Sequence, residues 1–206
     1  MPARLRPTAP LAPDAILVGD PGRSLLLAQE LLEQPKMSNH ARGLWGYTGR
    51  TAAGDPLSVQ ATGMGGPSAA LVLADLAKLG VVRVVRVGTC AAFGARARTG
   101  ELLLVEAVLA TGGSAASFGI AAGETVAPEP ALHERLAVQL GKDARPVTVA
   151  SLDTMPAEAA GEAEAADMQT LAVLSTADKL GMAAAAVLIV SERGKELIGE
   201  IGRAHV

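Results

Sequence analysis

The sequence predicts an α/β fold whose sheet is covered by helices on both faces. Two patterns support this prediction. Short apolar runs alternate along the chain with segments whose apolar residues recur at helical spacing. The apolar runs are continuous, which is typical of strands buried on both sides. The chain has 206 residues, no internal repeat and no dividing linker, so we expect a single domain over residues 1–206.

The first half of the chain begins with an apolar run that ends in a glycine-containing turn at residues 19–23. Leucines at helical spacing follow it, and a glycine-rich turn at 63–68 precedes a second helical segment that stops at Gly80. In this half we expect a strand at 15–18, a helix at 24–34, a hairpin of strands at 45–51 and 57–61, and a helix from the glycine-rich turn to Leu79.

The second half contains four further apolar runs and three helical patterns. We expect strands at 81–87, 101–109, 146–150 and 185–190, and helices at 131–140, 167–180 and 194–203. The Ala/Glu-rich stretch at 157–167 fits either a solvated loop or part of a helix. Because ligands bind at the carboxyl ends of strands in such sheets, the strand-to-helix junctions are the places to search for a site.

Composition excludes several classes of function. Aromatic residues make up 2% of the chain and the net charge is −3 without a basic block, so a nucleic-acid partner is not expected. The longest apolar stretch, 182–190, is too short for a bilayer, which requires about 20 residues. Prolines interrupt the N-terminal apolar run, and Cys90 is the only cysteine. We therefore expect a cytoplasmic protein without a membrane partner.

Two glycine-containing junctions could bind an anion. Gly19 and Arg23 belong to the turn Gly-Asp-Pro-Gly-Arg before a helix, where free N–H groups and a guanidinium would favour phosphate. A tight turn with a solvent-facing arginine is an equally simple interpretation. The turn at 63–68, which contains Met64, resembles a phosphate loop only weakly and lacks the complete dinucleotide pattern.

Three later junctions place polar residues beside apolar runs. Arg86 lies inside a strand and requires an anionic partner, which could be a ligand or an internal carboxylate; Arg83 should point to the opposite face. Asp167 could cap a helix, and Gln169 could face solvent. Glu192 follows a buried strand, where it could act as a general acid or pair with a neighbour. The histidines, His40, His133 and His205, are scattered, so we expect no metal site.

Taken together and in this order, these junctions resemble the nucleoside phosphorylases of the hexameric purine and uridine type, from about Asp14 to Glu192. The resemblance implies a single-domain, three-layer α/β/α fold with a central mixed sheet. It implies phosphorolysis of a nucleoside to free base and (deoxy)ribose 1-phosphate, with inorganic phosphate as co-substrate and no other cofactor. Its implied phosphate-binding residues are Gly19, Arg23, Arg42, Arg86 and Thr89.

The resemblance also implies which residues bind the nucleoside and which are catalytic. Its implied nucleoside-binding residues are Met64, Met155, Asp167, Met168 and Gln169, and its implied catalytic residues are Glu192, near the base, and Arg86. In the family Arg42 serves a neighbouring subunit, which implies a homo-oligomer, either a dimer or a trimer of dimers.

Some positions depart from the family pattern. Gln169 stands where the family has a glutamate that holds the ribose hydroxyls, Glu192 replaces an aspartate, and Thr8 is the nearest counterpart of an N-terminal histidine. A hydrolytic nucleosidase, or a degenerate homologue that only binds a nucleoside or phosphate, therefore remain alternatives. The three arginines favour phosphorolysis, because hydrolysis does not require them.

Overall fold

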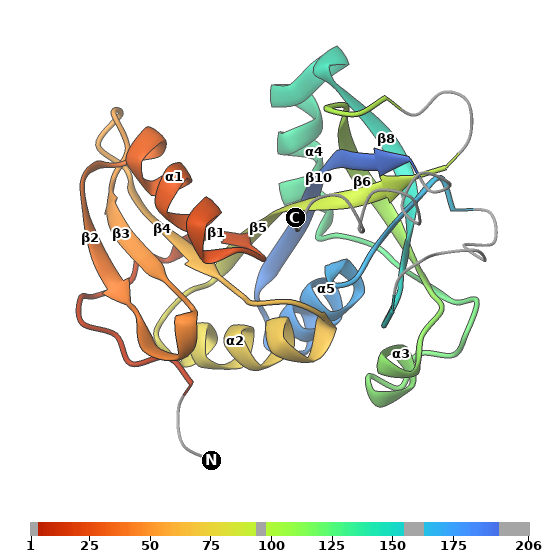
Figure 1. Ribbon diagram of the computed structural model, residues 1–206, viewed down its shortest axis with the longest axis horizontal. Helices are drawn as coiled ribbons and strands as arrows, with labels where there is room; N and C mark the ends of the chain where they lie inside the picture. Colours follow the sequence, from red (N-terminus) through yellow and green to blue (C-terminus); the bar gives the residue numbers. More distant parts are fainter. Residues whose placement is uncertain (1–3, 94–97, 155–162, 194–206) are drawn as a thin grey trace, which may run out of the picture.

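The computed structural model describes residues 4–93, 98–154 and 163–193 (Figure 1). Its strands are β1 (Asp14–Val18), β2 (Glu33–Asn39), β3 (Gly46–Arg50), β4 (Pro56–Ala61), β5 (Arg83–Ala92), β6 (Leu102–Ala110), β7 (Thr125–Val126), β8 (Ala144–Ser151), β9 (Ala165–Asp167) and β10 (Ala183–Arg193). Its α-helices are α1 (Pro21–Leu31), α2 (Gly66–Lys78), α3 (Gly113–Ser117), α4 (Pro130–Leu140) and α5 (Thr170–Lys179), with short 3-10 turns at Ala41–Gly43 and Gly141–Asp143.

The strands form one mixed sheet. β1 runs parallel to β4 and β5, β5 runs parallel to β10, and β8 runs parallel to β6 and β9. The hairpins β2–β3 and β3–β4 and the pairs β5–β9, β6–β7 and β6–β10 are antiparallel. Because β10 pairs with both β5 and β6, the pairings β5–β10–β6–β8–β9–β5 close into a ring.

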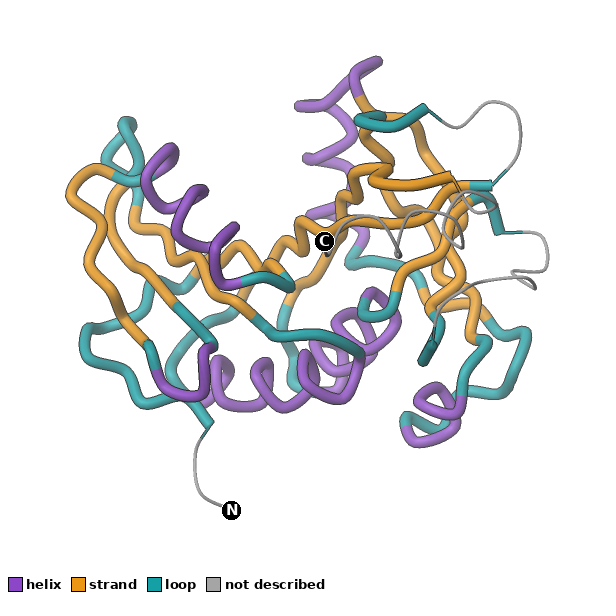
Figure 2. The backbone as a smooth tube through the Cα atoms, viewed as in Figure 1, coloured by secondary structure: helices purple, strands orange, loops and turns teal. Residues whose placement is uncertain are grey.

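Helices cover both faces of this sheet. α1 and α4 lie on one face, and α2 and α5 pack side by side on the other (Figures 1 and 2). The largest apolar cluster lies between the sheet and the α2–α5 layer and includes Leu17, Leu73, Val84, Val173 and Leu188, all 1% exposed or less. The predicted fold class, α/β with a covered mixed sheet, is confirmed. In the described part of the chain, none of the helices combines the length and the apolar character needed to cross a membrane.

The boundaries of the first helix differ from the prediction. α1 begins three residues earlier because Asp20 caps it and Pro21 occupies its first position. It ends at Leu31, and residues 33–39 form β2, which the sequence analysis missed. Much of β2 is exposed and polar, so it carries no apolar run that would reveal it.

The second half also needs corrections. Residues 165–167 form the buried strand β9 and not part of a helix, and α5 begins at Thr170 instead of residue 167. β5 continues to Ala92, past its predicted end at residue 87, because it pairs with β10 as far as that residue. The predicted helix at 194–203 lies outside the described residues.

Candidate active site

A cavity of about 560 Å³ lies where the carboxyl ends of several strands converge. Residues at or just after the ends of β1, β4, β5, β9 and β10 line it, as expected for ligand sites in α/β sheets. Its lining consists of Gly19, Arg23, Gly63, Met64, Gly65, Arg86, Gly88, Thr89, Cys90, Ala91, Asp153, Ala166, Asp167, Met168, Gln169 and Ser191. Eight of the residues predicted for the site therefore share one cavity: Gly19, Arg23, Met64, Arg86, Thr89, Asp167, Met168 and Gln169.

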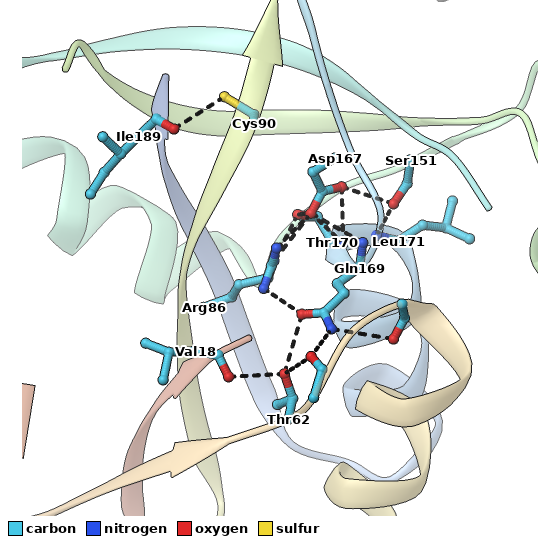
Figure 3. Close-up of polar contacts among 12 residues, drawn as sticks. Val18, Thr62, Arg86, Cys90, Ser151, Asp167, Gln169, Thr170, Leu171 and Ile189 are labelled. Carbon is cyan, nitrogen blue, oxygen red and sulfur yellow. Dashed lines mark hydrogen bonds and ion pairs between the residues drawn. The ribbon is translucent and has the colours of Figure 1, made fainter. Parts of the chain in front are cut away.

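Arg86 is the buried cation of this cavity, with a side chain that is 5% exposed. Its Nη2 lies 2.8 Å from Asp167 Oδ2 and its Nε lies 3.2 Å from the same oxygen. Nη1 donates to Gln169 Oε1 at 2.7 Å (Figure 3). The arginine thus has the internal carboxylate that the sequence analysis considered, and the same pair also lines the cavity.

The Asp167 side chain is fully buried, and groups other than Arg86 also donate hydrogen bonds to it. Ser151 Oγ donates to its Oδ1 at 2.9 Å, and Thr170 Oγ1 donates to its Oδ2 at 2.6 Å. Its carboxylate also accepts the backbone N–H groups of Gln169 and Thr170 at the start of α5. These N–H groups and hydroxyls, together with Arg86, satisfy the hydrogen-bonding capacity of the buried carboxylate from within the protein.

Gln169 does not face solvent, which was one interpretation of the sequence. It is 4% exposed, and its amide bridges two elements. The amide oxygen accepts from Arg86, and the amide nitrogen donates to the Gly63 carbonyl at 2.5 Å and to the Gly65 carbonyl at 3.3 Å. Gln169 therefore connects the buried arginine to the glycine-rich turn between β4 and α2.

Gly88 makes room for the arginine. A Cβ atom at this position would lie 2.5 Å from Arg86 Nη2 and 2.6 Å from Arg86 Cζ. The guanidinium therefore rests directly on the backbone of β5, two residues further along the same strand. Any side chain at residue 88 would have to displace it.

The guanidinium of Arg86 still has hydrogen-bonding capacity. It carries five N–H groups, two on each Nη and one on Nε. The bonds made within the described residues use Nε–H and one N–H on each Nη. Two N–H groups are left, and Arg86 lines the cavity. A buried, oriented guanidinium with donors to spare is suited to bind an oxyanion.

Arg23 supplies a second cation to the lining of the cavity. It lies in the first turn of α1, where Asp20 Oδ1 accepts the Arg23 N–H at 2.9 Å. Its side chain is exposed and lines the cavity together with Gly19. The half-buried Thr89 adds a hydroxyl from β5. The residues predicted to bind phosphate from within one chain thus share one cavity.

Among the lining residues that were not predicted for the site, Asp153, Cys90 and Ser191 carry side chains with polar or ionisable groups. Asp153 follows β8 and accepts the Ser114 N–H at 2.9 Å, and hydrogen bonds from Ser114 hold the pKa of its carboxyl below the usual value. Burial raises the pKa of the Cys90 thiol to about 12, so the thiol is protonated at neutral pH and is not an activated nucleophile. Ser191 donates to the Cys90 carbonyl at 3.2 Å. Asp153 was missed because it follows β8 in a segment without a glycine signal.

Other predicted residues do not join the cavity. Arg42 lies between β2 and β3 with a φ of 60°, is exposed, and does not line the cavity. Met155 lies outside the described residues. The backbone of Glu192 belongs to β10, and its side chain lies outside the described part. In the part of the chain that the structure describes, no cluster of three or more histidine, cysteine or acidic side chains could hold a metal ion.

Comparison with known proteins identifies the family of the chain. The model of the Phosphorylase superfamily matches residues 13–202. The chain belongs to this superfamily.

Individual relatives agree with this assignment. A DeoD-type purine nucleoside phosphorylase of Clostridium beijerinckii is 31% identical over 90% of this chain and 83% of its own length. A DeoD-type enzyme of Oceanobacillus iheyensis is 39% identical over a shorter match, 47% of this chain and 41% of its own length. Among solved structures, the purine nucleoside phosphorylase of Toxoplasma gondii, in complex with immucillin-H, superposes with a TM-score of 0.81. It is 21% identical, and the match covers 92% of this chain and 81% of that one.

Proposed function

We propose that this chain is a nucleoside phosphorylase, which cleaves an N-glycosidic bond with inorganic phosphate to give a free base and a (deoxy)ribose 1-phosphate. The observation that carries the proposal is the buried Arg86, held by Asp167 and Gln169 with two N–H groups to spare, in a cavity that also contains Arg23. Membership of the superfamily and the names of the relatives support the same reaction.

Phosphate is a weak nucleophile, so the enzyme must bind and orient it. Arg86 and Arg23 neutralise the dianion, and Thr89 and the Gly19 N–H complete its hydrogen bonds. A phosphate oxygen attacks the anomeric carbon as the bond to the base nitrogen breaks, and the bonding electron pair leaves with the base. The bound phosphate stabilises the positive charge that develops on the sugar.

The leaving base gains a pair of electrons and departs more readily when it is protonated. Glu192 would supply this proton, a form of help typically worth about 10²–10⁴-fold. Met64 and Met168, with Met155, would form the apolar part of the nucleoside site. The relatives are purine nucleoside phosphorylases, so a purine nucleoside is the substrate that we propose.

We also propose that several copies of this chain assemble into the active enzyme. Arg42 is exposed and does not line the cavity of its own chain, so it is available to reach the phosphate of a neighbouring subunit in a homo-oligomer, either a dimer or a trimer of dimers. We propose a cytoplasmic enzyme that uses phosphate as co-substrate and no other cofactor.

The test is release of free base from a panel of purine and pyrimidine nucleosides, with and without phosphate. Phosphate-dependent release that is lost in Arg86→Ala supports phosphorolysis. Arg83→Ala is the matched control, because Arg83 lies on the same strand outside this cavity. Release without phosphate would assign a nucleosidase instead, and no release from any nucleoside would leave a ligand-binding homologue.

A further inference from the structure

Gln169 has a role in this chain beyond that of a nucleoside ligand. We infer that it is a positioning residue, whose amide fixes both the guanidinium of Arg86 and the glycine-rich turn at residues 63–65, and that an ionised carboxylate at this position could not make both contacts. The inference rests on the proposed function, because the consequence that we test is phosphate use.

The amide nitrogen of Gln169 makes the contact that is specific to glutamine. It donates to the Gly63 and Gly65 carbonyls at 2.5 and 3.3 Å. Both glycines have positive φ, 73° and 79°, so the turn has a backbone shape that other residues rarely adopt. The hydrogen bonds from Gln169 therefore tie α5 to one defined conformation of this turn (Figure 3).

The amide oxygen faces donors. Arg86 Nη1 donates to it at 2.7 Å. Thr62 Oγ1 lies 3.2 Å away, and its one proton is shared between this oxygen and the Val18 carbonyl at 3.0 Å. The two ends of one amide thus meet donors on one side and acceptors on the other. A glutamate of the same shape would still accept from Arg86, but its second oxygen would face the Gly63 carbonyl without a proton to donate.

Charge balance leads to the same conclusion. Arg86 is paired one-to-one with Asp167, and the neutral Gln169 leaves this balance unchanged. A carboxylate at position 169 would compete with phosphate for the remaining N–H groups of the guanidinium. It would also release the turn that carries Met64, a cavity-lining residue that is 90% exposed. The glutamate typical of the family is therefore expected to impair this particular site.

The decisive experiment compares Gln169→Glu with Gln139→Glu, which makes the same substitution on the exposed side of α4. At pH 8 we expect the KM for phosphate to rise about tenfold or more in Gln169→Glu, because the Gly63 carbonyl loses its donor and faces a negative charge instead, and to stay unchanged in the control. Unchanged phosphate KM, or faster cleavage of ribonucleosides by Gln169→Glu, would overturn the inference.

A pH profile separates positioning from a general structural role. A protonated glutamic acid can donate to the Gly63 carbonyl as the amide does, so the defect of Gln169→Glu relative to wild type should shrink as the pH falls from 8 to 5. Gln169→Met has neither donor nor acceptor, so its defect should not change with pH. Parallel profiles for the two variants would contradict the inference.

Two further measurements keep the inference testable. If the wild-type chain releases no base, the proposed function fails, and phosphate binding measured by calorimetry still tests Gln169: weaker binding in Gln169→Glu, but not in Gln139→Glu, supports the inference. If neither variant at position 169 folds, as judged by circular dichroism, Thr62→Val removes the hydroxyl that lies 3.2 Å from the amide oxygen and 3.0 Å from the Val18 carbonyl. It should raise the phosphate KM in the same direction by a smaller factor, and an unchanged KM would count against positioning.

Discussion

Arg83 and Arg86 lie three residues apart on β5, and each forms an ion pair with an aspartate. Arg83 pairs with Asp14, and the two side chains are 40% and 33% exposed. Arg86 pairs with Asp167, and those side chains are 5% and 0% exposed. Because the spacing is odd, the two arginines point to opposite faces of the sheet, as the sequence predicted. The same kind of pair therefore occurs in two very different environments on one strand.

The difference shows that an ion pair alone does not indicate a site. An exposed pair is screened by water and contributes little to stability. A buried pair is tolerated only where further hydrogen bonds satisfy both charges, and Asp167 receives such bonds from Ser151 and Thr170. The groups that satisfy Arg86 come from segments that surround a cavity, so the requirements of burial also build the proposed phosphate site.

Removal of the buried arginine should have the largest effect on stability. Arg86→Ala leaves the Asp167 carboxylate buried without its cation, which should lower the free energy of unfolding by about 3–5 kcal/mol. Urea unfolding measures this loss. A loss below about 1 kcal/mol would mean that the helix N–H groups and hydroxyls satisfy Asp167 without Arg86, and the contrast between the two arginines would fail.

Gly88→Ala disturbs the position of the same arginine without removing it. The new methyl group would lie 2.5 Å from Arg86 Nη2 and 3.0 Å from Leu188 Cδ2, and overpacking of this kind costs about 1–3 kcal/mol. We expect phosphate-dependent activity to fall more than stability does, because the guanidinium must shift. Unfolding and kinetic measurements on one preparation compare the two effects. Ala92→Gly, on the same strand but outside the cavity lining, tests the general sensitivity of β5 to a change of one methyl group.

Removal of Arg83, which belongs to the more exposed pair, should have only a small effect on stability. Arg83→Ala should lower the free energy of unfolding by less than about 1 kcal/mol, because Asp14 can be solvated when its partner is lost. Raising the salt concentration should narrow the difference from wild type further, whereas the Arg86→Ala difference should persist. If Arg83→Ala is as destabilising as Arg86→Ala, burial does not separate the two pairs.

The sequence predicted the strands and helices around the cavity more accurately than the hydrogen bonds and ion pairs within it. Continuous apolar runs revealed the buried strands, whereas β2 and β9 lacked such a signal, the first because it is polar and the second because it has only three residues. The carboxylate partner of Arg86 is 81 residues away, so no local pattern could identify it. The bridging role of Gln169 depends on the conformation of a distant turn, which spacing does not report.

We expect the smallest loss of stability from a change at Asp153, whose surroundings differ from those of Asp167. Both carboxylates accept an N–H near the start of a helix, but Asp153 is exposed, and within the described residues no arginine forms an ion pair with it. Hydrogen bonds from Ser114 lower the pKa of Asp153 in the folded state. The ionised Asp153 therefore stabilises the fold at pH values above its unfolded pKa, about 3.9. This stabilisation is lost as the pH falls through the lower folded pKa.

Asp153→Asn should therefore cost at most about 1 kcal/mol at pH 7, as for a helix cap. Urea unfolding from pH 7 to 3 should show the gap between variant and wild type closing toward the acid end. A gap that persists unchanged at pH 3 would show that the charge of Asp153 is not what stabilises α3.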